Sequence, residues 1–237
     1  CESAAYMTGD RILGVLGGMG PLATVEFLRK LIEHTPAEID QDHVPCITYS
    51  IPQIPCRVAA ILENGDSPLP ALMDGVKSLE AAGARAIAIP CVTAHHWFEQ
   101  MAASTRLPFL HIAEATIRVL ATDAKAGRSV GILATQATLT TGHFQRALSD
   151  AGYQTLTPDE EVMQELVLPA IANVKTSNKP KALQLVVKAL EALRAHGAER
   201  IVLACTELPV ALDGAEPQYI EGCVDTLDAL AQACVDW

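Results

Sequence analysis

Two cysteines stand where a reactive thiol could act on a small molecule. Cys91 follows the apolar run 86–89, and Cys205 follows the apolar run 201–204. Both runs are typical of buried strands in a parallel sheet, and such sheets bind ligands beyond the carboxyl ends of their strands. A helix is expected to begin just after each cysteine, where exposed N–H groups and the positive end of the helix dipole stabilise a thiolate. The two thiols are therefore candidates for a base or a nucleophile.

Opposed thiols across one cleft suit proton transfer at the α-carbon of a carboxylic acid. A thiolate on one face removes the proton and a thiol on the other face returns one, so the stereocentre inverts without a cofactor. The pair holds one proton between its two sulfurs, so their titrations are coupled. The carbanion needs hydrogen-bond donors aimed at its carboxylate. We expect backbone N–H groups to supply them at Val92, Thr93, Ala94 and Thr206.

The chain carries two pairs of matching segments. Residues 82–91 read AGARAIAIPC and residues 196–205 read HGAERIVLAC. Residues 11–18 read RILGVLGG and residues 128–135 read RSVGILAT. Any two βα units share part of such a pattern, so chance similarity is the alternative to duplication. Because both pairs occur in the same order with nearly the same spacing, we favour a duplicated unit in which each half supplies one cysteine.

Short apolar runs alternate with helical stretches along the whole chain. Strands are predicted at 12–16, 44–49, 86–89, 130–133 and 201–204. Helices are predicted at 21–34, 69–82, 94–104, 113–126, 137–150, 160–174, 179–196 and 224–235. This alternation predicts an α/β protein of two pseudo-symmetric, doubly wound parallel-sheet sub-domains with the active site in the cleft between them. We place the sub-domains at 9–113 and 114–222, with the C-terminal helix 223–237 packing back onto the first.

The composition indicates a globular protein that acts on a small molecule. Of 237 residues, 50% are hydrophobic and 19% charged, which excludes a disordered chain. The net charge of −11 disfavours nucleic acid as a partner, and no run approaches the roughly 20 apolar residues of a membrane span. Seven cysteines and no recognisable signal segment predict free thiols in the cytoplasm. We expect Cys46 and Cys234 to be buried structural thiols.

The glycine-rich segment 14–20, GVLGGMG, lacks the spacing of a dinucleotide-binding loop. We interpret it as a strand-to-helix turn whose backbone approaches the ligand, with Met19 lining the site. A metal site is not expected, because the adjacent His95 and His96 would diverge by about 100° on a helix and no Cys-x-x-Cys pair occurs.

Four segments together resemble the cofactor-independent aspartate/glutamate racemases. They are GVLGGMGPLAT at 14–24, IPQIPCR at 51–57, IPCVTAH at 89–95 and LACTELP at 203–209. The opening segment looks most like the aspartate racemase branch. The resemblance covers almost the whole chain and implies a homodimer.

The resemblance also implies a role for particular residues. Cys91 and Cys205 would transfer the protons, and the segment 92–94 would hold the carboxylate or amino group of the substrate. Arg57 would bind a side-chain carboxylate with help from Lys175. A guanidinium suits this role because its planar fork matches a carboxylate.

Two positions depart from the family pattern. Val92 stands where the family usually has asparagine, and Cys56 stands where it often has aspartate. An amide at the first position could hydrogen-bond the substrate, and an acid at the second could orient Arg57 or meet an ammonium. The departures leave the identity of the substrate open.

The sequence thus predicts a racemase of an acidic amino acid, with aspartate first and glutamate or a broader range also possible. One alternative is a related isomerase or decarboxylase of another carboxylic acid. The other is a non-catalytic protein that binds an amino acid or a dicarboxylic acid. A cysteine hydrolase would leave the second, repeated cysteine unexplained.

Overall fold

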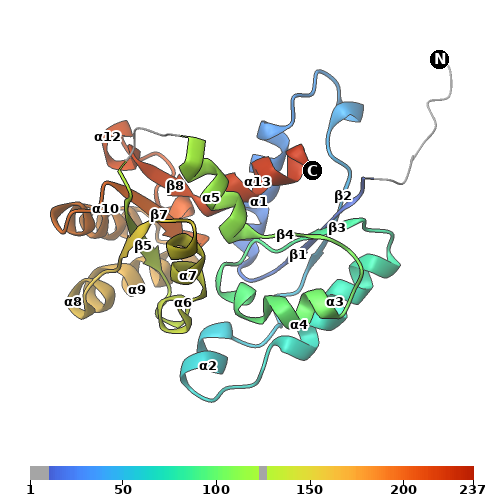
Figure 1. Ribbon diagram of the computed structural model, residues 1–237, viewed down its shortest axis with the longest axis horizontal. Helices are drawn as coiled ribbons and strands as arrows, with labels where there is room; N and C mark the ends of the chain where they lie inside the picture. Colours follow the sequence, from blue (N-terminus) through green and yellow to red (C-terminus); the bar gives the residue numbers. More distant parts are fainter. Residues whose placement is uncertain (1–10, 123–126) are drawn as a thin grey trace.

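The computed structural model describes residues 11–122 and 127–237. They form two parallel four-stranded sheets flanked by helices (Figure 1), which confirms the predicted α/β class with two similar units. The first sheet has the order β2-β1-β3-β4 and the second the order β6-β5-β7-β8. The strands are β1 (Leu13–Gly17), β2 (Cys46–Ser50), β3 (Ala86–Ala88), β4 (Phe109–Leu110), β5 (Ser129–Ala134), β6 (Gln154–Leu156), β7 (Arg200–Ala204) and β8 (Cys223–Asp225).

The strand order supports the internal repeat. When the strands of each half are numbered separately, both sheets have the strand order second, first, third, fourth. The matching segments occupy equivalent places, since one pair contains β1 and β5 and the other contains β3 and β7. In both halves the first and third strands are central neighbours, so the residues that follow them emerge at the same edge of the sheet.

The helices cover the sheets on both faces. In the first half they are α1 (Pro21–His34), α2 (Arg57–Leu62), α3 (Leu69–Ala81), α4 (Phe98–Ala103) and α5 (Ile112–Thr122), with short 3₁₀ turns η1 (Asp40–Asp42) and η2 (Thr93–Trp97). In the second half they are α6 (Gln136–Thr141), α7 (His143–Asp150), α8 (Glu160–Val162), the π-turn η3 (Met163–Val167), α9 (Leu168–Lys175), α10 (Lys179–Ala195), α11 (Glu207–Ala211), α12 (Pro217–Ile220) and α13 (Thr226–Asp236).

Several predicted helices have different boundaries in the structure. The helix expected at 137–150 is divided at Gly142, whose φ of 66° is left-handed and interrupts the helix. The helix expected at 113–126 is described to Thr122, and its residues 123–126 lie outside the described part. The segment expected as a helix from residue 223 begins instead with β8, which pairs with β7 in the second sheet.

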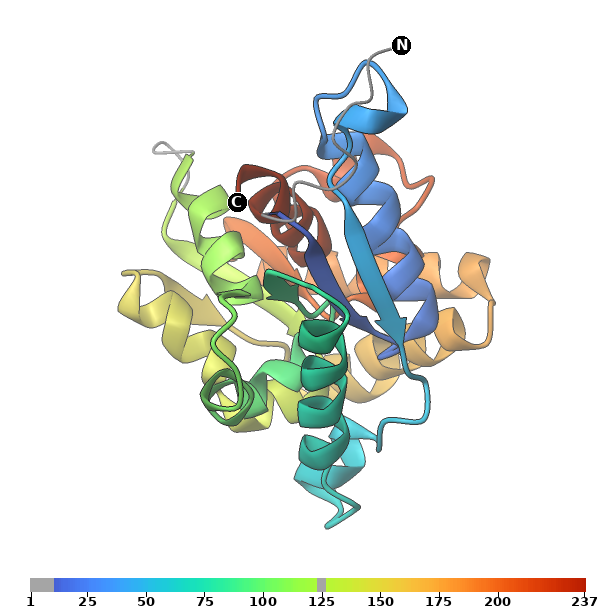
Figure 2. The ribbon, with the colours of Figure 1, turned by 90° about the vertical axis from the view of Figure 1, so that its right-hand side faces the viewer.

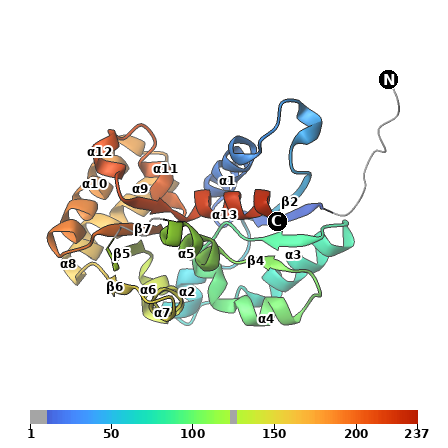
Figure 3. The ribbon, with the colours of Figure 1, turned by 45° about the horizontal axis from the view of Figure 1, so that its top comes forward.

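A shared core joins the two halves. One cluster of buried side chains includes Leu13 of β1, Ile132 of β5 and Leu230 of α13. Helix α13 packs against both α1 and α5 and lies at the seam between the sheets (Figure 3). The sub-domain boundaries at 9–113 and 114–222 stay a prediction. None of the helices described here combines the length and apolar character that crossing a bilayer requires.

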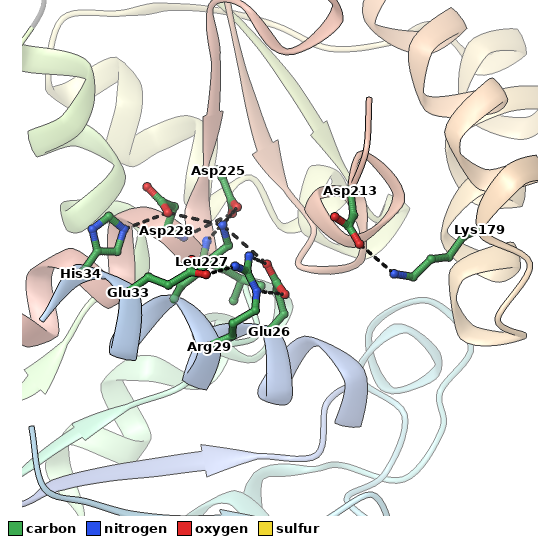
Figure 4. Close-up of polar contacts among 10 residues, drawn as sticks. Glu26, Arg29, Glu33, His34, Lys179, Asp213, Asp225, Leu227 and Asp228 are labelled. Carbon is green, nitrogen blue, oxygen red and sulfur yellow. Dashed lines mark hydrogen bonds and ion pairs between the residues drawn. The ribbon is translucent and has the colours of Figure 1, made fainter. Parts of the chain in front are cut away.

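A cluster of charged side chains reinforces this seam. Lys30 Nζ of α1 lies 3.0 Å from Asp225 Oδ2 and 3.4 Å from Asp228 Oδ1, and the lysine side chain is 13% exposed. His34 Nε2 lies 2.9 Å from Asp228 Oδ1. Figure 4 shows His34 of α1 facing Asp228, with Asp225 beside it at the start of α13. Asp225 also caps α13 by accepting hydrogen bonds from two backbone N–H groups.

We expect Lys30→Met to lower the free energy of unfolding by about 1–3 kcal/mol, because it leaves the Asp225 carboxylate, whose side chain is 18% exposed, without its cation. Urea denaturation measures the change. The matched control is Lys179→Met, since Lys179 pairs with Asp213 on the surface at 3.0 Å (Figure 4). An exposed pair contributes less than about 1 kcal/mol, so equal losses in the two variants would contradict the prediction.

Strand β2 differs from the sequence expectation. It is the edge strand of its sheet, and four of its five residues are exposed. Cys46, which we expected to be buried, is exposed, whereas Cys234 is buried as predicted. In Figure 2 the light-blue β2 lies at the outer edge with α1 beside it. The apolar run at 44–49 suggested a buried strand. An edge strand is paired on one side only, so more of its surface stays exposed.

Candidate functional site

A cavity lies between the carboxyl ends of the strands of the two halves. The space within it that the centre of a water molecule can reach has a volume of ≈ 70 Å³. It is lined by Met19, Gly20, Cys56, Arg57, Val58, Cys91, Val92, Thr93, Thr135, Lys175, Cys205, Thr206 and Glu207. Eight of the nine residues predicted for the site are therefore brought together. Ala94, the ninth, is buried, and its backbone N–H favours the thiolate form of Cys91.

A glycine turn brings the first half to the cavity. Gly18 follows β1 with a φ of 92°, and a Cβ at this position would lie 2.4 Å from the backbone nitrogen of Ile51. A side chain is excluded there, so the chain can turn tightly from β1 into α1. Thr24 Oγ1 holds the turn by accepting from the Gly18 N–H at 2.9 Å. Met19 and Gly20 reach the cavity as a result.

Cys91 is buried beside a cation. Cys91 is 6% exposed, and burial raises the pKa of its thiol above the ordinary value. The Arg57 guanidinium and the Ala94 N–H oppose this shift because they favour the thiolate. The sequence predicted that exposed N–H groups and a helix dipole stabilise this thiolate. The Ala94 N–H is such a group, although the element that follows is the short 3₁₀ turn η2. Burial and then Arg57 have the largest effects on the pKa of this thiol.

Cys205 is buried beside an anion. Its Sγ donates a hydrogen bond to Glu207 Oε2 at 3.1 Å, and the residue is 4% exposed. Burial, and then the Glu207 carboxylate, raise the pKa of the Cys205 thiol well above its ordinary value. Lys175 at the end of α9 opposes this shift. The two sulfurs therefore sit in unequal electrostatic surroundings.

Arg57 begins α2 and has unused donors. Its Nη1 donates to the carbonyl oxygens of Ile54 and Pro55 at 3.1 and 3.0 Å. Its Nε is buried and has no hydrogen-bond partner among the described residues. A guanidinium fixed at one end with a free donor edge is suited to binding a carboxylate.

Threonine hydroxyls connect the two halves at the cavity. Thr93 Oγ1 of the first half lies 3.1 Å from Thr135 Oγ1 and 2.9 Å from Thr138 Oγ1 of the second half. Thr135 Oγ1 also lies 3.0 Å from Thr138 Oγ1, and it caps α6 by accepting from the Thr138 N–H. These contacts fix the segment after Cys91 to the opposite half.

Two histidines hold the backbone around Cys91. His95 Nδ1 lies 2.9 Å from the Cys91 carbonyl oxygen, and His143 Nε2 lies 3.3 Å from the Val92 carbonyl oxygen. Burial lowers the pKa of His95 to about 3 and the pKa of His143 to about 4, so both rings are neutral near pH 7. Among the described residues neither sulfur is hydrogen-bonded to an imidazole, as a cysteine hydrolase would need.

The sequence interpretation missed Thr135 and Glu207. The repeat could have identified Thr135, since it follows β5 in the segment that matches the glycine turn after β1. Glu207 lies within LACTELP, two residues after Cys205, but the spacing alone does not show that its carboxylate turns back to the thiol. Gly20, Cys56 and Val58 also line the cavity without having been assigned to it.

Comparisons with known proteins agree with this arrangement. The family model described as Asp/Glu/hydantoin racemase matches residues 16–234. The broad specificity amino-acid racemase RacX of Bacillus subtilis is 30% identical over 228 residues, which cover 94% of this chain and 96% of the relative.

Solved structures extend the likeness to the fold. The aspartate racemase of Picrophilus torridus superposes with a TM-score of 0.83 at 35% identity. The superposed part covers 95% of this chain and 93% of the Picrophilus torridus chain. A glutamate racemase isoform of Bacillus anthracis shares the fold at 16% identity, with a TM-score of 0.67 over 94% of this chain and 79% of its own. The chain thus belongs to the Asp/Glu/hydantoin racemase family of isomerases, which confirms the resemblance drawn from its motifs.

Proposed function

We propose that the protein racemises an acidic amino acid, aspartate first, by proton transfer at Cα between Cys91 and Cys205. The observation that carries the proposal is that one cavity is lined by these two cysteines, one from each half, together with Arg57 and Lys175. The aspartate racemase of Picrophilus torridus, 35% identical, supports aspartate as the first substrate to test.

The reaction needs no group other than the chain's own residues. One thiolate takes the Cα proton, and the electron pair of the broken C–H bond moves into the substrate's carboxylate. The opposite thiol gives its proton to the other face of Cα and becomes the thiolate. Backbone N–H groups at Val92, Thr93 and Thr206 are proposed to stabilise the negative charge on the carboxylate.

Two cations suit the side chain of a dicarboxylic amino acid. Arg57 and Lys175 line the cavity in a chain whose net charge is −11. Local positive charge is required here because the protein as a whole repels a dianion. The Arg57 guanidinium is proposed to bind the side-chain carboxylate, with Lys175 as a second cation.

A second candidate is racemisation of a broader range of amino acids. Val92 and Cys56 line the cavity with an apolar side chain and a thiol where the family pattern has an amide and an acid. The relative RacX is described as a broad specificity amino-acid racemase, which supports testing this candidate. A kcat/KM for neutral amino acids within about tenfold of that for aspartate would favour it.

The deciding experiment is exchange of the Cα hydrogen in D₂O. The protein is incubated with L- and D-aspartate, both glutamates and a neutral panel, and deuterium at Cα is followed by NMR. Exchange accompanied by inversion supports the proposal. Loss of carbon dioxide would indicate a decarboxylase, and binding without exchange would indicate a binding protein.

The mechanism requires reduced thiols and therefore a reducing compartment, for which we propose the cytoplasm. The six cysteines of the described residues are all free, which is consistent with this location.

We also propose a homodimer, which the family resemblance implied. Five large apolar side chains are exposed on α1, on the segment after it and on β2: Leu22, Val25, Ile32, Ile39 and Tyr49. An exposed edge strand beside an apolar helix is a surface that a second copy would cover.

We expect Val25→Glu to shift the mass in sedimentation equilibrium from twice 25.2 kDa toward 25.2 kDa. Val25 is 62% exposed, so a charge there destabilises an interface and not the monomer fold. The control is Ile220→Glu, which alters an exposed apolar residue on α12. A dimer that tolerates Val25→Glu would place the interface elsewhere.

A further inference from the structure

We propose that Cys91 is the first of the two thiols to ionise and that Cys205 keeps its proton, because Arg57 and Glu207 place opposite charges beside the two sulfurs. The terms base and acid rest on the proposed function, whereas the order of ionisation does not. Glu207 is a positioning residue in this scheme, since it acts through Cys205.

The geometry beside Cys205 favours its protonated form. The thiol of Cys205 donates to Glu207 Oε2 at 3.1 Å in a buried setting, and a thiolate has no proton to donate. A Cβ at Gly20 would lie 3.2 Å from Glu207 Oε1, so the carboxylate lies against the residue that precedes the fourteen-residue helix α1.

The surroundings of Cys91 favour ionisation more than those of Cys205. Arg57 lines the same cavity as Cys91, and its guanidinium and the Ala94 N–H both favour the Cys91 thiolate. Glu207 also faces Cys91, but its effect on that thiol is weaker than that of Arg57. Lys175 faces Cys205, where its effect is weaker than that of Glu207. The charge with the largest influence is therefore positive at Cys91 and negative at Cys205.

This asymmetry sets the order of proton movements in a turnover. From the form in which Cys91 is ionised, Cys91 takes the Cα proton and Cys205 donates its own to the opposite face. The enzyme is left with a thiol at Cys91 and a thiolate at Cys205, next to the Glu207 carboxylate. It returns to the starting form when the Cys91 proton passes to solvent and Cys205 takes one up. Of the two singly ionised forms, the enantiomer whose Cα–H faces Cys91 therefore meets the more populated one.

Alkylation by iodoacetamide at a series of pH values measures the ionisation of each thiol without any substrate. Thiolates react and thiols do not, and peptide mass spectrometry resolves the individual cysteines. Cys91 and Cys205 are 6% and 4% exposed, so access to the reagent is comparable. We expect half-maximal alkylation of Cys91 at a lower pH than that of Cys205.

Glu207→Gln keeps an oxygen that can accept from the thiol but removes the charge. We expect it to move the Cys205 profile down by about one to three pH units and the Cys91 profile by less. Glu207→Asp retains the charge and should restore part of the difference. The control Glu216→Gln removes an exposed carboxylate away from the cavity and should move neither profile. Circular dichroism establishes that each variant is folded.

The inference is overturned if wild-type Cys205 is alkylated at the same or a lower pH than Cys91. It is also overturned if a folded Glu207→Gln variant leaves the Cys205 profile unchanged. Ordered alkylation without Cα exchange would reject the proposed racemase and keep the proposed order of ionisation. Cα exchange with equal alkylation would do the reverse.

Discussion

Cys91→Ser and Cys205→Ser each reduce the rate of inversion of aspartate by about 10²–10⁴-fold or more, the range that general acid–base groups contribute. A serine hydroxyl is a much weaker acid than a thiol, so neither a base nor a proton donor is left at that face of the substrate. Circular dichroism of the reaction mixture follows inversion directly. Cys46→Ser, which alters an exposed cysteine outside the cavity, serves as the control and should keep full activity.

Exchange experiments separate the two faces of the substrate. In Cys205→Ser the Cys91 base is intact, so deuterium can enter one enantiomer with retention of configuration while inversion is lost. Cys91→Ser should show the complementary behaviour with the other enantiomer. Full racemase activity in either variant would show that its sulfur carries no proton.

Arg57→Gln lowers kcat/KM for aspartate by about 10–100-fold, because a hydrogen bond to a charged group contributes about 1.5–3 kcal/mol. A neutral amino acid loses less, since it has no side-chain carboxylate for the guanidinium to bind. Initial rates with aspartate and alanine measure the two effects. Lys175→Gln offers a comparison in which the second cation is removed. Equal losses for aspartate and alanine would contradict a role for Arg57 in binding the side chain.

The same variant shifts the pH dependence in a defined direction. Burial raises the pKa of Cys91 and Arg57 lowers it, so removal of the guanidinium raises it further. Activity depends on the Cys91 thiolate, which is present above that pKa and lost below it. The acidic limb of kcat/KM against pH should therefore move to higher pH in Arg57→Gln. A limb that stays in place, or moves down, would exclude Arg57 as an influence on the base.

The sequence was informative where the repeat applied. Strands β1, β3, β5 and β7 are continuous apolar runs, and they carry the matching segments, so both the fold class and the position of the cysteines followed from them. Strands β4, β6 and β8 have two or three residues each and were not predicted. Such short segments leave no periodic pattern, and tertiary pairing alone defines them.

The electrostatics of the cavity could not be predicted from residue order. The helix-dipole argument treated Cys91 and Cys205 alike, because each precedes a helical element. The difference between them depends on where the Arg57 and Glu207 side chains point, and on how completely the cavity removes both sulfurs from water. Those are properties of packing between two halves that are distant in sequence.

The three threonine hydroxyls at the junction of the halves have one further consequence. Thr93, Thr135 and Thr138 form a closed triangle of contacts, and each hydroxyl owns a single proton. When the three protons run round the triangle, each hydroxyl donates once and accepts once. Thr135 Oγ1 also accepts from the Thr138 N–H, so its proton and both of its lone pairs are used. The triangle is therefore saturated at Thr135, where it ties the two halves together and leaves the hydrogen-bonding of a guest to other residues of the cavity.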